Sequence, residues 1–92
     1  MAGNMNDQYE MGMRFTKMLM DFNLSLRASM MELEKAHEAV SPLWQDDMRK
    51  YYDQIWGPFR QTMMHYDKVE GPSYVEFLHI KMHATGRYLQ GG

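Results

Sequence analysis

The chain has 92 residues, no cysteine and a formal net charge of −2, and 45% of its residues are hydrophobic. A chain of this length forms one domain, residues 1–92, which neither disulfides nor thiolate metal sites can stabilise. Because the charge is small and no segment forms a basic tail, nucleic acid and anionic membranes are poor targets. No apolar run approaches the roughly 20 residues of a membrane span, and no signal peptide is recognisable. We expect no membrane insertion, and a protein that is cytoplasmic or secreted without a cleavable leader.

A long amphipathic helix is predicted over about residues 8–39. Apolar side chains recur there in alternating steps of four and three, the spacing that keeps one stripe against a neighbouring helix. The stripe consists of Phe15, Leu19, Phe22, Leu26, Ser29, Leu33, Ala36 and Val40. We therefore expect these residues to form the packing seam of an all-α protein.

Ser41 and Pro42 interrupt this pattern, because proline disfavours the helical conformation of the residue before it. Ser41 can cap a second helix whose first turn suits Pro42. That helix is predicted over about residues 43–69, antiparallel to the first. Pro58 follows Gly57 in its middle and lacks the amide that continues the ladder, so a kink is expected near residue 57. The predicted seam of the second helix is Trp44, Met48, Tyr51, Ile55, Pro58, Thr62, His65 and Val69, flanked by Tyr52, Phe59 and Tyr66.

A short third helix is predicted over about residues 74–88. Gly71 and Pro72 punctuate the chain before it, and Ser73 followed by Glu76 has the spacing of a capping box. Its apolar face consists of Val75, Leu78, Met82, Thr85 and Leu89. This helix can pack on its own hairpin or on another chain, since the Gly-Pro pair permits both.

The first helix carries a second apolar stripe, offset from the seam by two residues, or about 200° at about 100° per residue. Its residues are Met13, Met20, Leu24, Ala28 and Met31. At about 1.5 Å per residue the third helix spans roughly 25 Å against roughly 45 Å for the first, so about half of this stripe stays uncovered even if the third helix folds over it. Methionine suits adaptable helix contacts. We predict a homo-oligomer or a helical protein partner that completes a bundle, with contacts from Met13, Met20, Leu24 and Met31.

The residues after the turn form the motif Leu43-Trp44-Gln45-Asp46-Asp47-Met48, followed by Tyr52. Trp44 can lie across the mouth of the hairpin, lock its angle, and cap a carbonyl of the first helix with its indole N–H. In this motif an aromatic residue is followed by a short polar residue two positions on, a small or apolar residue four positions on and a second aromatic residue eight positions on. This spacing resembles the signature of the WXG-type superfamily associated with type VII secretion. The resemblance runs from about residue 11 to 70. Family members usually carry glycine where this chain has Asp46, whose carboxylate instead favours the N-terminus of a helix.

This resemblance implies a secreted substrate, a chaperone-like partner or a structural adaptor, commonly a four-helix dimer and not an enzyme. It adds Trp44 and Asp46 to the candidate partner-binding residues. The family often has a tyrosine followed four residues later by an acidic residue as part of an export signal, and Tyr66 and Glu70 match this spacing. The chain itself offers no cysteine nucleophile and no glycine-rich phosphate loop, which also favours a non-catalytic protein.

The alternative is a ferritin-like metal-binding bundle formed on oligomerisation. Glu76, His79 and His83 share one helical face, and Glu-x-x-His spacing occurs twice in the chain. The second copy of that spacing consists of Glu34 and His37. A full site also needs an inward glutamate from each of two further helices, which the middle of the second helix does not supply. We therefore expect no cofactor, with a metal ion as the alternative.

Overall fold

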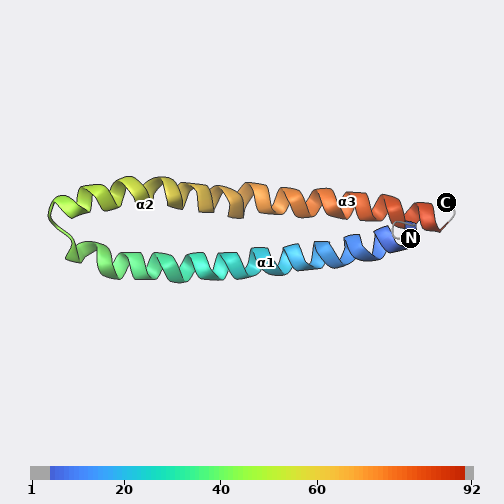
Figure 1. Ribbon diagram of the computed structural model, residues 1–92, viewed down its shortest axis with the longest axis horizontal. Coiled ribbons are helices and arrows are strands. Elements are labelled where there is room, and N and C mark those ends of the chain that lie inside the picture. Colours follow the sequence, from blue (N-terminus) through green and yellow to red (C-terminus); the bar gives the residue numbers. More distant parts are fainter. Residues whose placement is uncertain (1–4, 91–92) are drawn as a thin grey trace.

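The computed structural model describes residues 5–90, which form an extended all-α hairpin (Figure 1). Helix α1 spans Met5–Val40 and leads into a 3-10 turn, η1, at Ser41–Leu43. The chain then returns through α2 (Asp47–His65), a π-helical segment η2 (Tyr66–Glu70) and α3 (Gly71–Leu89). These three segments form one rod antiparallel to α1, so the start of α1 lies beside the end of α3. The predicted hairpin is confirmed.

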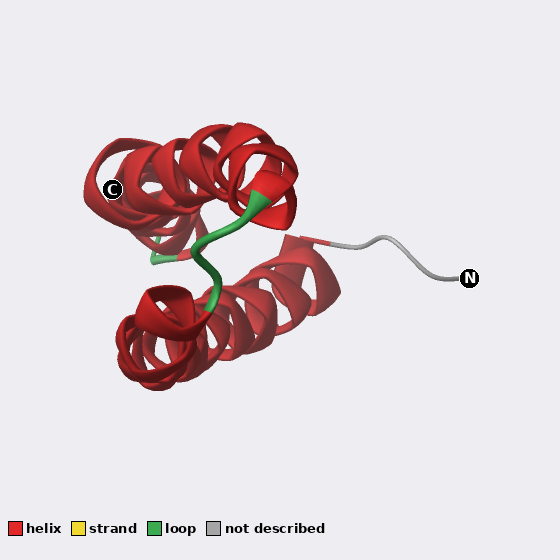
Figure 2. Cartoon of the chain, turned by 90° about the vertical axis from the view of Figure 1, so that its left-hand side faces the viewer, coloured by secondary structure: helices red, strands yellow, loops and turns green. Residues whose placement is uncertain are grey.

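The third helix does not fold back on the hairpin. The chain passes Pro72 through a bulge in the helix and does not turn there. Proline has no amide hydrogen, and its ring collides with the carbonyl four residues earlier, so a regular α-helical ladder cannot pass it. The backbone widens into a π turn at this point, and the Gly71 N–H donates to the carbonyl of Tyr66, five residues back. The view along the hairpin from the turn shows two rods side by side (Figure 2). The prediction of a separate third helix is therefore wrong.

The predicted capping box at Ser73 is not formed either. The Ser73 hydroxyl donates to the carbonyl of Val69 at 2.6 Å, a bond made by serines inside helices. Glu70 occupies the N-cap position of α3 without a capping bond from its side chain. Ser73 and Glu76 thus lie inside a helix that has already begun.

The cap of α2 is Asp46, because Asp46 Oδ1 accepts a hydrogen bond from the Met48 amide at 3.0 Å. This confirms the capping role expected of that carboxylate, whereas Ser41 belongs to the 3-10 turn and does not cap α2. Further along, α2 continues through Gly57 and Pro58 without interruption. The rod is gently bowed there and not sharply bent (Figure 1).

The packing seam lies one residue away from the predicted stripe on both rods. Leu19 and Leu26 do face the return rod, but Phe15 and Phe22 are 55% and 54% exposed. On α2 the whole predicted stripe is exposed. The residues that are buried or half-buried on α1 are Tyr9, Gly12, Thr16, Leu19, Asn23, Leu26, Met30, Glu34, His37 and Val40, and those on α2 include Arg49, Tyr52, Trp56, Arg60 and Met63.

Small residues explain this choice of seam, because they let α1 and α3 approach closely. A Cβ atom added at Gly12 would lie 2.3 Å from Met82 Sδ, and one added at Gly86 would lie 3.2 Å from Tyr9 Cε2. Thr16 is only 3% exposed between the rods. Side chains of the facing helix therefore pack directly on the two glycines, and the bulkier phenylalanines lie to the side of this stripe.

The hairpin has almost no core. Among residues 5–90 the only buried hydrophobic side chains are Met30 and Met82, each 9% exposed. The molecule measures 66 × 22 × 16 Å and exposes 7532 Å². A compact protein of the same mass would expose about 5,600 Å². Much of the apolar surface of this chain is therefore left uncovered.

Candidate protein-interaction faces

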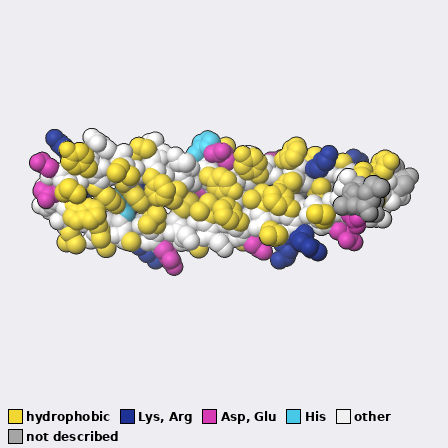
Figure 3. All heavy atoms as spheres, in the orientation of Figure 1, with side chains coloured by type: hydrophobic (Ala, Val, Ile, Leu, Met, Phe, Trp, Pro, Cys, Tyr) yellow, Lys and Arg dark blue, Asp and Glu magenta, His cyan; other side chains and the backbone are white. Residues whose placement is uncertain are grey.

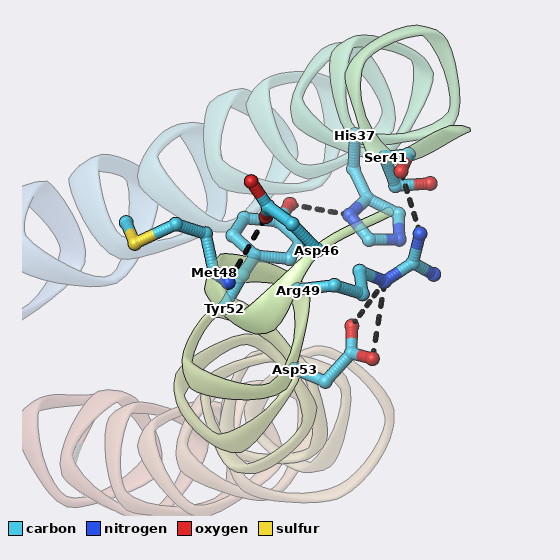
Figure 4. A network of polar contacts seen from close by, with 7 residues as sticks. All are labelled: His37, Ser41, Asp46, Met48, Arg49, Tyr52 and Asp53. Atoms are coloured by element: carbon cyan, nitrogen blue, oxygen red, sulfur yellow. Dashed lines mark hydrogen bonds and ion pairs between the residues drawn. The ribbon is translucent and has the colours of Figure 1, made fainter. Parts of the chain in front are cut away.

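A cluster of rings joins the two rods at the turn end, and Figure 4 shows two of its members, His37 and Tyr52. His37 Nδ1 and the Tyr52 hydroxyl share a hydrogen bond, and the His37 ring stacks on Trp56 with ring centroids 4.3 Å apart. Trp44 lies edge-on against Tyr52 at 4.8 Å and stays 41% exposed. The clamp across the hairpin is therefore made by His37 with Tyr52 and Trp56, not by Trp44 as predicted.

Arg49 ties the beginning of α2 to the turn. Its Nη1 donates to the Ser41 carbonyl at 2.5 Å, and its Nε bonds both oxygens of Asp53 at 3.0 and 3.1 Å (Figure 4). The bond to Ser41 joins the first turn of α2 to η1, the 3-10 turn that follows α1. The sequence pattern does not predict this contact, because Arg49 would be interpreted from the pattern alone as a charged residue on a solvent-exposed helix.

The middle of the seam is polar. The Tyr66 hydroxyl donates to Asn23 Oδ1 at 2.7 Å, and Arg27 Nε pairs with Asp67 Oδ1 at 2.9 Å. Both pairs join α1 to η2, the segment that passes Pro72. These directional contacts set the register of the rods, because an apolar seam alone would tolerate sliding.

The predicted export residues, Tyr66 and Glu70, stand at the two ends of η2. Tyr66 is half-buried against α1, where its ring also meets Phe22 edge-on at 6.4 Å. Glu70 instead pairs with the exposed His65 at 2.9 Å on its own rod. One residue thus contributes to the seam and the other to a surface ion pair.

The residues of the alternative metal site are not brought together within the chain. Glu34 pairs with Arg60, and His37 belongs to the ring cluster, both toward the turn. The other three predicted ligands lie on α3 toward the open end: Glu76, His79 and His83. In the part of the chain that the structure describes, no group of three or more His, Cys, Asp or Glu residues is placed to hold a metal ion.

The second apolar stripe of α1 is exposed, and α3 runs beside it instead of covering it. Met13, Met20, Leu24 and Met31 are 41–62% exposed. Between the rods lies an open groove of about 430 Å³, which we call the methionine groove; its apolar lining is Met20, Leu24, Pro72, Val75 and Ile80. Met31 lines the next hollow along the hairpin, beyond the Arg27–Asp67 pair.

The exposed members of the predicted seam stripe of α1, Phe15, Phe22 and Leu33, lie on the side of the hairpin opposite the groove. Residues two apart on a helix, such as Met20 and Phe22, point roughly 160° apart. Hydrophobic side chains gather over both rods from the turn to the open end (Figure 3). We call the surface opposite the groove the aromatic face and define it by Phe15, Phe22, Leu33, Met48, Ile55, Phe59, Tyr74 and Phe77, all 40–73% exposed.

A hollow of about 490 Å³ opens at the turn end of the aromatic face. It is lined by Trp44, Asp46, Met48, Tyr51, Tyr52 and Ile55. Two of the predicted partner-binding residues, Trp44 and Asp46, therefore lie at this hollow and not at the methionine groove. The six predicted residues are divided between two sides of the molecule.

Comparison with models of protein families, with curated proteins and with solved structures finds no match for this chain. Within residues 5–90, no helix combines the length and the apolar character that crossing a membrane requires. The geometry itself therefore defines the class: an extended helical hairpin with an apolar surface on each side.

Proposed function

We propose that this chain is a non-catalytic interaction protein that acts by packing its hairpin against other helices. The observation that carries the proposal is the exposure of apolar side chains along both sides of a hairpin with only two buried hydrophobic residues among those described. Monomeric proteins rarely expose contiguous apolar patches beyond about 300–600 Å². Covering apolar surface releases roughly 25 cal/mol per Å², so a helical partner would supply the stabilisation that the hairpin lacks.

The resemblance of the Trp44 motif to the WXG-type superfamily supports a more specific role. Under this proposal the chain is a secreted substrate, a chaperone-like partner or a structural adaptor of a type VII-like export pathway. The hairpin shape, the tryptophan at the turn and the Tyr66/Glu70 spacing support it. Asp46 departs from the family pattern because it caps α2, so close approach of a partner backbone at a glycine is not part of the proposal.

The methionine groove is the surface we assign to a helical partner. Met20 and Leu24 face α3 across an open channel, and Met13 and Met31 extend the apolar line beyond it. Flexible methionines can adapt to the side chains of an amphipathic helix laid along this channel. Met20→Glu should therefore weaken pairing with such a helix at least tenfold in Kd.

The role at the turn is tested by co-expressing the chain with the product of each adjacent gene and measuring complex formation and export. Trp44→Ala should abolish both, because the exposed ring and its hollow are lost. Leu43→Ala is the matched control, since Leu43 is 76% exposed in the same turn and lies outside the hollow. Pairing and export that survive Trp44→Ala would refute the WXG-like role.

A further inference from the structure

Three methionine side chains from both rods line one small hollow beside the Arg27–Asp67 pair. Met30 and Met31 belong to α1, and Met64 belongs to α2. We infer that the thioether sulfurs of these three residues form a binding site for copper(I), a soft monovalent cation. We call this place the thioether hollow. The site goes beyond the proposed function, because it requires neither a partner nor export.

The size of the thioether hollow suits an ion. Its volume is about 130 Å³, whereas pockets for small organic molecules hold about 300–1,000 Å³. Met30 is 9% exposed and Met64 is half-buried, so two of the three side chains are shielded between the rods. Met31 is 60% exposed, which keeps the hollow accessible from solvent.

The donor atoms of the hollow select the metal. Thioether sulfur is a soft ligand that suits copper(I), whereas magnesium and calcium take oxygen ligands and zinc is held mainly by thiolate and imidazole. The chain has no cysteine, and none of the described residues that line the hollow is a histidine. Glu34 lines it but is paired with Arg60. Asp67 lines it as well and is paired with Arg27 at 2.9 Å. The thioethers are therefore the ligands that remain available.

The charge around the hollow favours a monovalent ion. Each of the two ion pairs is neutral as a whole, and thioethers carry no charge. A divalent cation would find no net negative charge there to offset the hydration that it loses on burial, and this loss grows with the square of the charge. A monovalent ion loses less hydration and still gains the sulfur ligands that it prefers.

Packing alone does not account for methionine at all three positions. Burial costs methionine more side-chain freedom than leucine, and leucine would fill a similar apolar volume. Met82 shows what packing by itself demands, because its sulfur fits closely over Gly12 where α1 and α3 meet. Around the thioether hollow, the property that the three side chains share and leucine lacks is the sulfur atom.

Copper(I) itself is the probe, supplied anaerobically to the full chain in competition with a coloured copper(I) chelator that reports the Kd. Met64→Leu should raise this Kd at least about tenfold, because one ligand is lost. Met63→Leu is the matched control and should leave the Kd unchanged. Met63 is the neighbouring half-buried residue of α2 and does not line the hollow. Exchange of methionine for leucine conserves volume, and helical circular dichroism checks that both variants fold.

Three results of this titration would overturn the inference. The first is a wild type that cannot retain copper(I) against the chelator. The second is an equal rise in Kd for Met63→Leu and Met64→Leu, which would show adventitious binding by methionines in general. The third is displacement of copper(I) by zinc, which would mean that the carboxylates and not the thioethers hold the metal.

The wild-type chain alone supplies a test that no variant can disturb. Silver(I) is a soft ion that replaces copper(I) without its redox chemistry, and isotope-labelled methionine methyl groups report its position by nuclear magnetic resonance. The first equivalent should shift the methyl signals of Met30, Met31 and Met64. The signal of Met18 should stay in place, since Met18 is 62% exposed on α1 and lies outside the hollow. A shift of Met18 before the other three would contradict the inference.

Bound metal should also stabilise the hairpin, because the ligands come from both rods and bind it only when the rods are together. The unfolding temperature of the wild type should therefore rise with copper(I) concentration. The Met64→Leu chain should melt at the same temperature with and without the metal. A wild type that copper(I) leaves unchanged would show that the metal does not join α1 to α2, contrary to the inference.

Discussion

Individual side chains matter more in this hairpin than in a compact domain, because few contacts join its rods. His37 illustrates this point. Its ring touches Trp56 and shares a hydrogen bond with Tyr52, so one residue of α1 engages two residues of α2. Histidine in that position had suggested a metal ligand, yet its neighbours in the fold are aromatic.

We expect His37→Ala to lower the free energy of unfolding by about 2 kcal/mol, because it removes one ring stack and one hydrogen bond. Urea denaturation followed by circular dichroism measures this loss. His79→Ala is the control, since His79 is exposed on α3 and should change stability by less than about 0.5 kcal/mol. Equal effects of the two substitutions would show that the ring cluster does not hold the hairpin.

Gly71 and Gly57 offer a matched comparison, because both lie in the return rod directly before a proline. A Cβ atom at Gly71 would lie 3.1 Å from the Tyr66 carbonyl oxygen and 3.2 Å from Asn23 Nδ2, whereas one at Gly57 meets nothing within 4 Å. Gly71→Ala should therefore be less stable than Gly57→Ala by on the order of 1–2 kcal/mol in thermal or urea unfolding. Equal stabilities would mean that the π turn tolerates a methyl group at its tightest point.

At the scale of elements, the two prolines of the return rod are accommodated differently. Pro72 is passed by a π turn that the Asn23–Tyr66 and Arg27–Asp67 contacts hold against α1. Pro58 is exposed inside α2, where its missing amide leaves the carbonyl four residues earlier without its helical donor. Pro72 is thus passed by a segment that packs against α1, whereas Pro58 only removes a hydrogen bond from α2.

Pro58→Ala should therefore stabilise the chain by roughly 1–3 kcal/mol and raise its helical circular dichroism, because it restores the missing bond of α2. Pro42→Ala should instead lower stability by about 0.5 kcal/mol, since proline in the turn restricts the unfolded chain. Thermal unfolding of the two variants beside the wild type measures both effects. A Pro58→Ala variant less stable than the wild type would indicate that Pro58 serves the fold in a way its exposure does not show.

At the scale of the whole molecule, shape and burial point to assembly. A rod-like hairpin 66 Å long has too little interior to bury the apolar residues of its 92-residue chain. Hydrophobic residues thus remain on two opposite sides, with the aromatic face on one and a groove with a charged rim on the other. Two different surfaces leave room for two different contacts.

If folding is coupled to assembly, the unfolding temperature should rise with chain concentration, because mass action favours the associated state. Circular dichroism melts over a hundredfold dilution series measure this dependence. Ile55→Glu should remove the dependence while leaving a helical chain that melts at a lower temperature. A wild type that melts at one temperature throughout the series would show that the hairpin is stable alone.

The local signals in the sequence were sufficient for several features. Alternating steps of three and four predicted the long helices, and the Ser41-Pro42 interruption predicted their reversal. Asp46 was correctly expected to favour the start of α2. The exposed stripe of Met20 and Leu24 was also expected, because its offset from the neighbouring stripe follows from helical geometry alone.

The tertiary structure decided which stripe faces inward and how Pro72 is passed. The Phe15 stripe and the neighbouring stripe through Gly12 and Thr16 have the same helical periodicity. Hydrophobicity favours the Phe15 stripe as the packing seam, although the other stripe faces the return rod. Close approach of α1 and α3 selects the small residues instead, and the phenylalanines become an exposed face. A Gly-Pro pair likewise permits a turn or a bulge. Only contacts between residues distant in sequence decide between such local alternatives. The sequence by itself therefore determined the helices and their reversal. The packing of one rod on the other determined which surfaces are available for function.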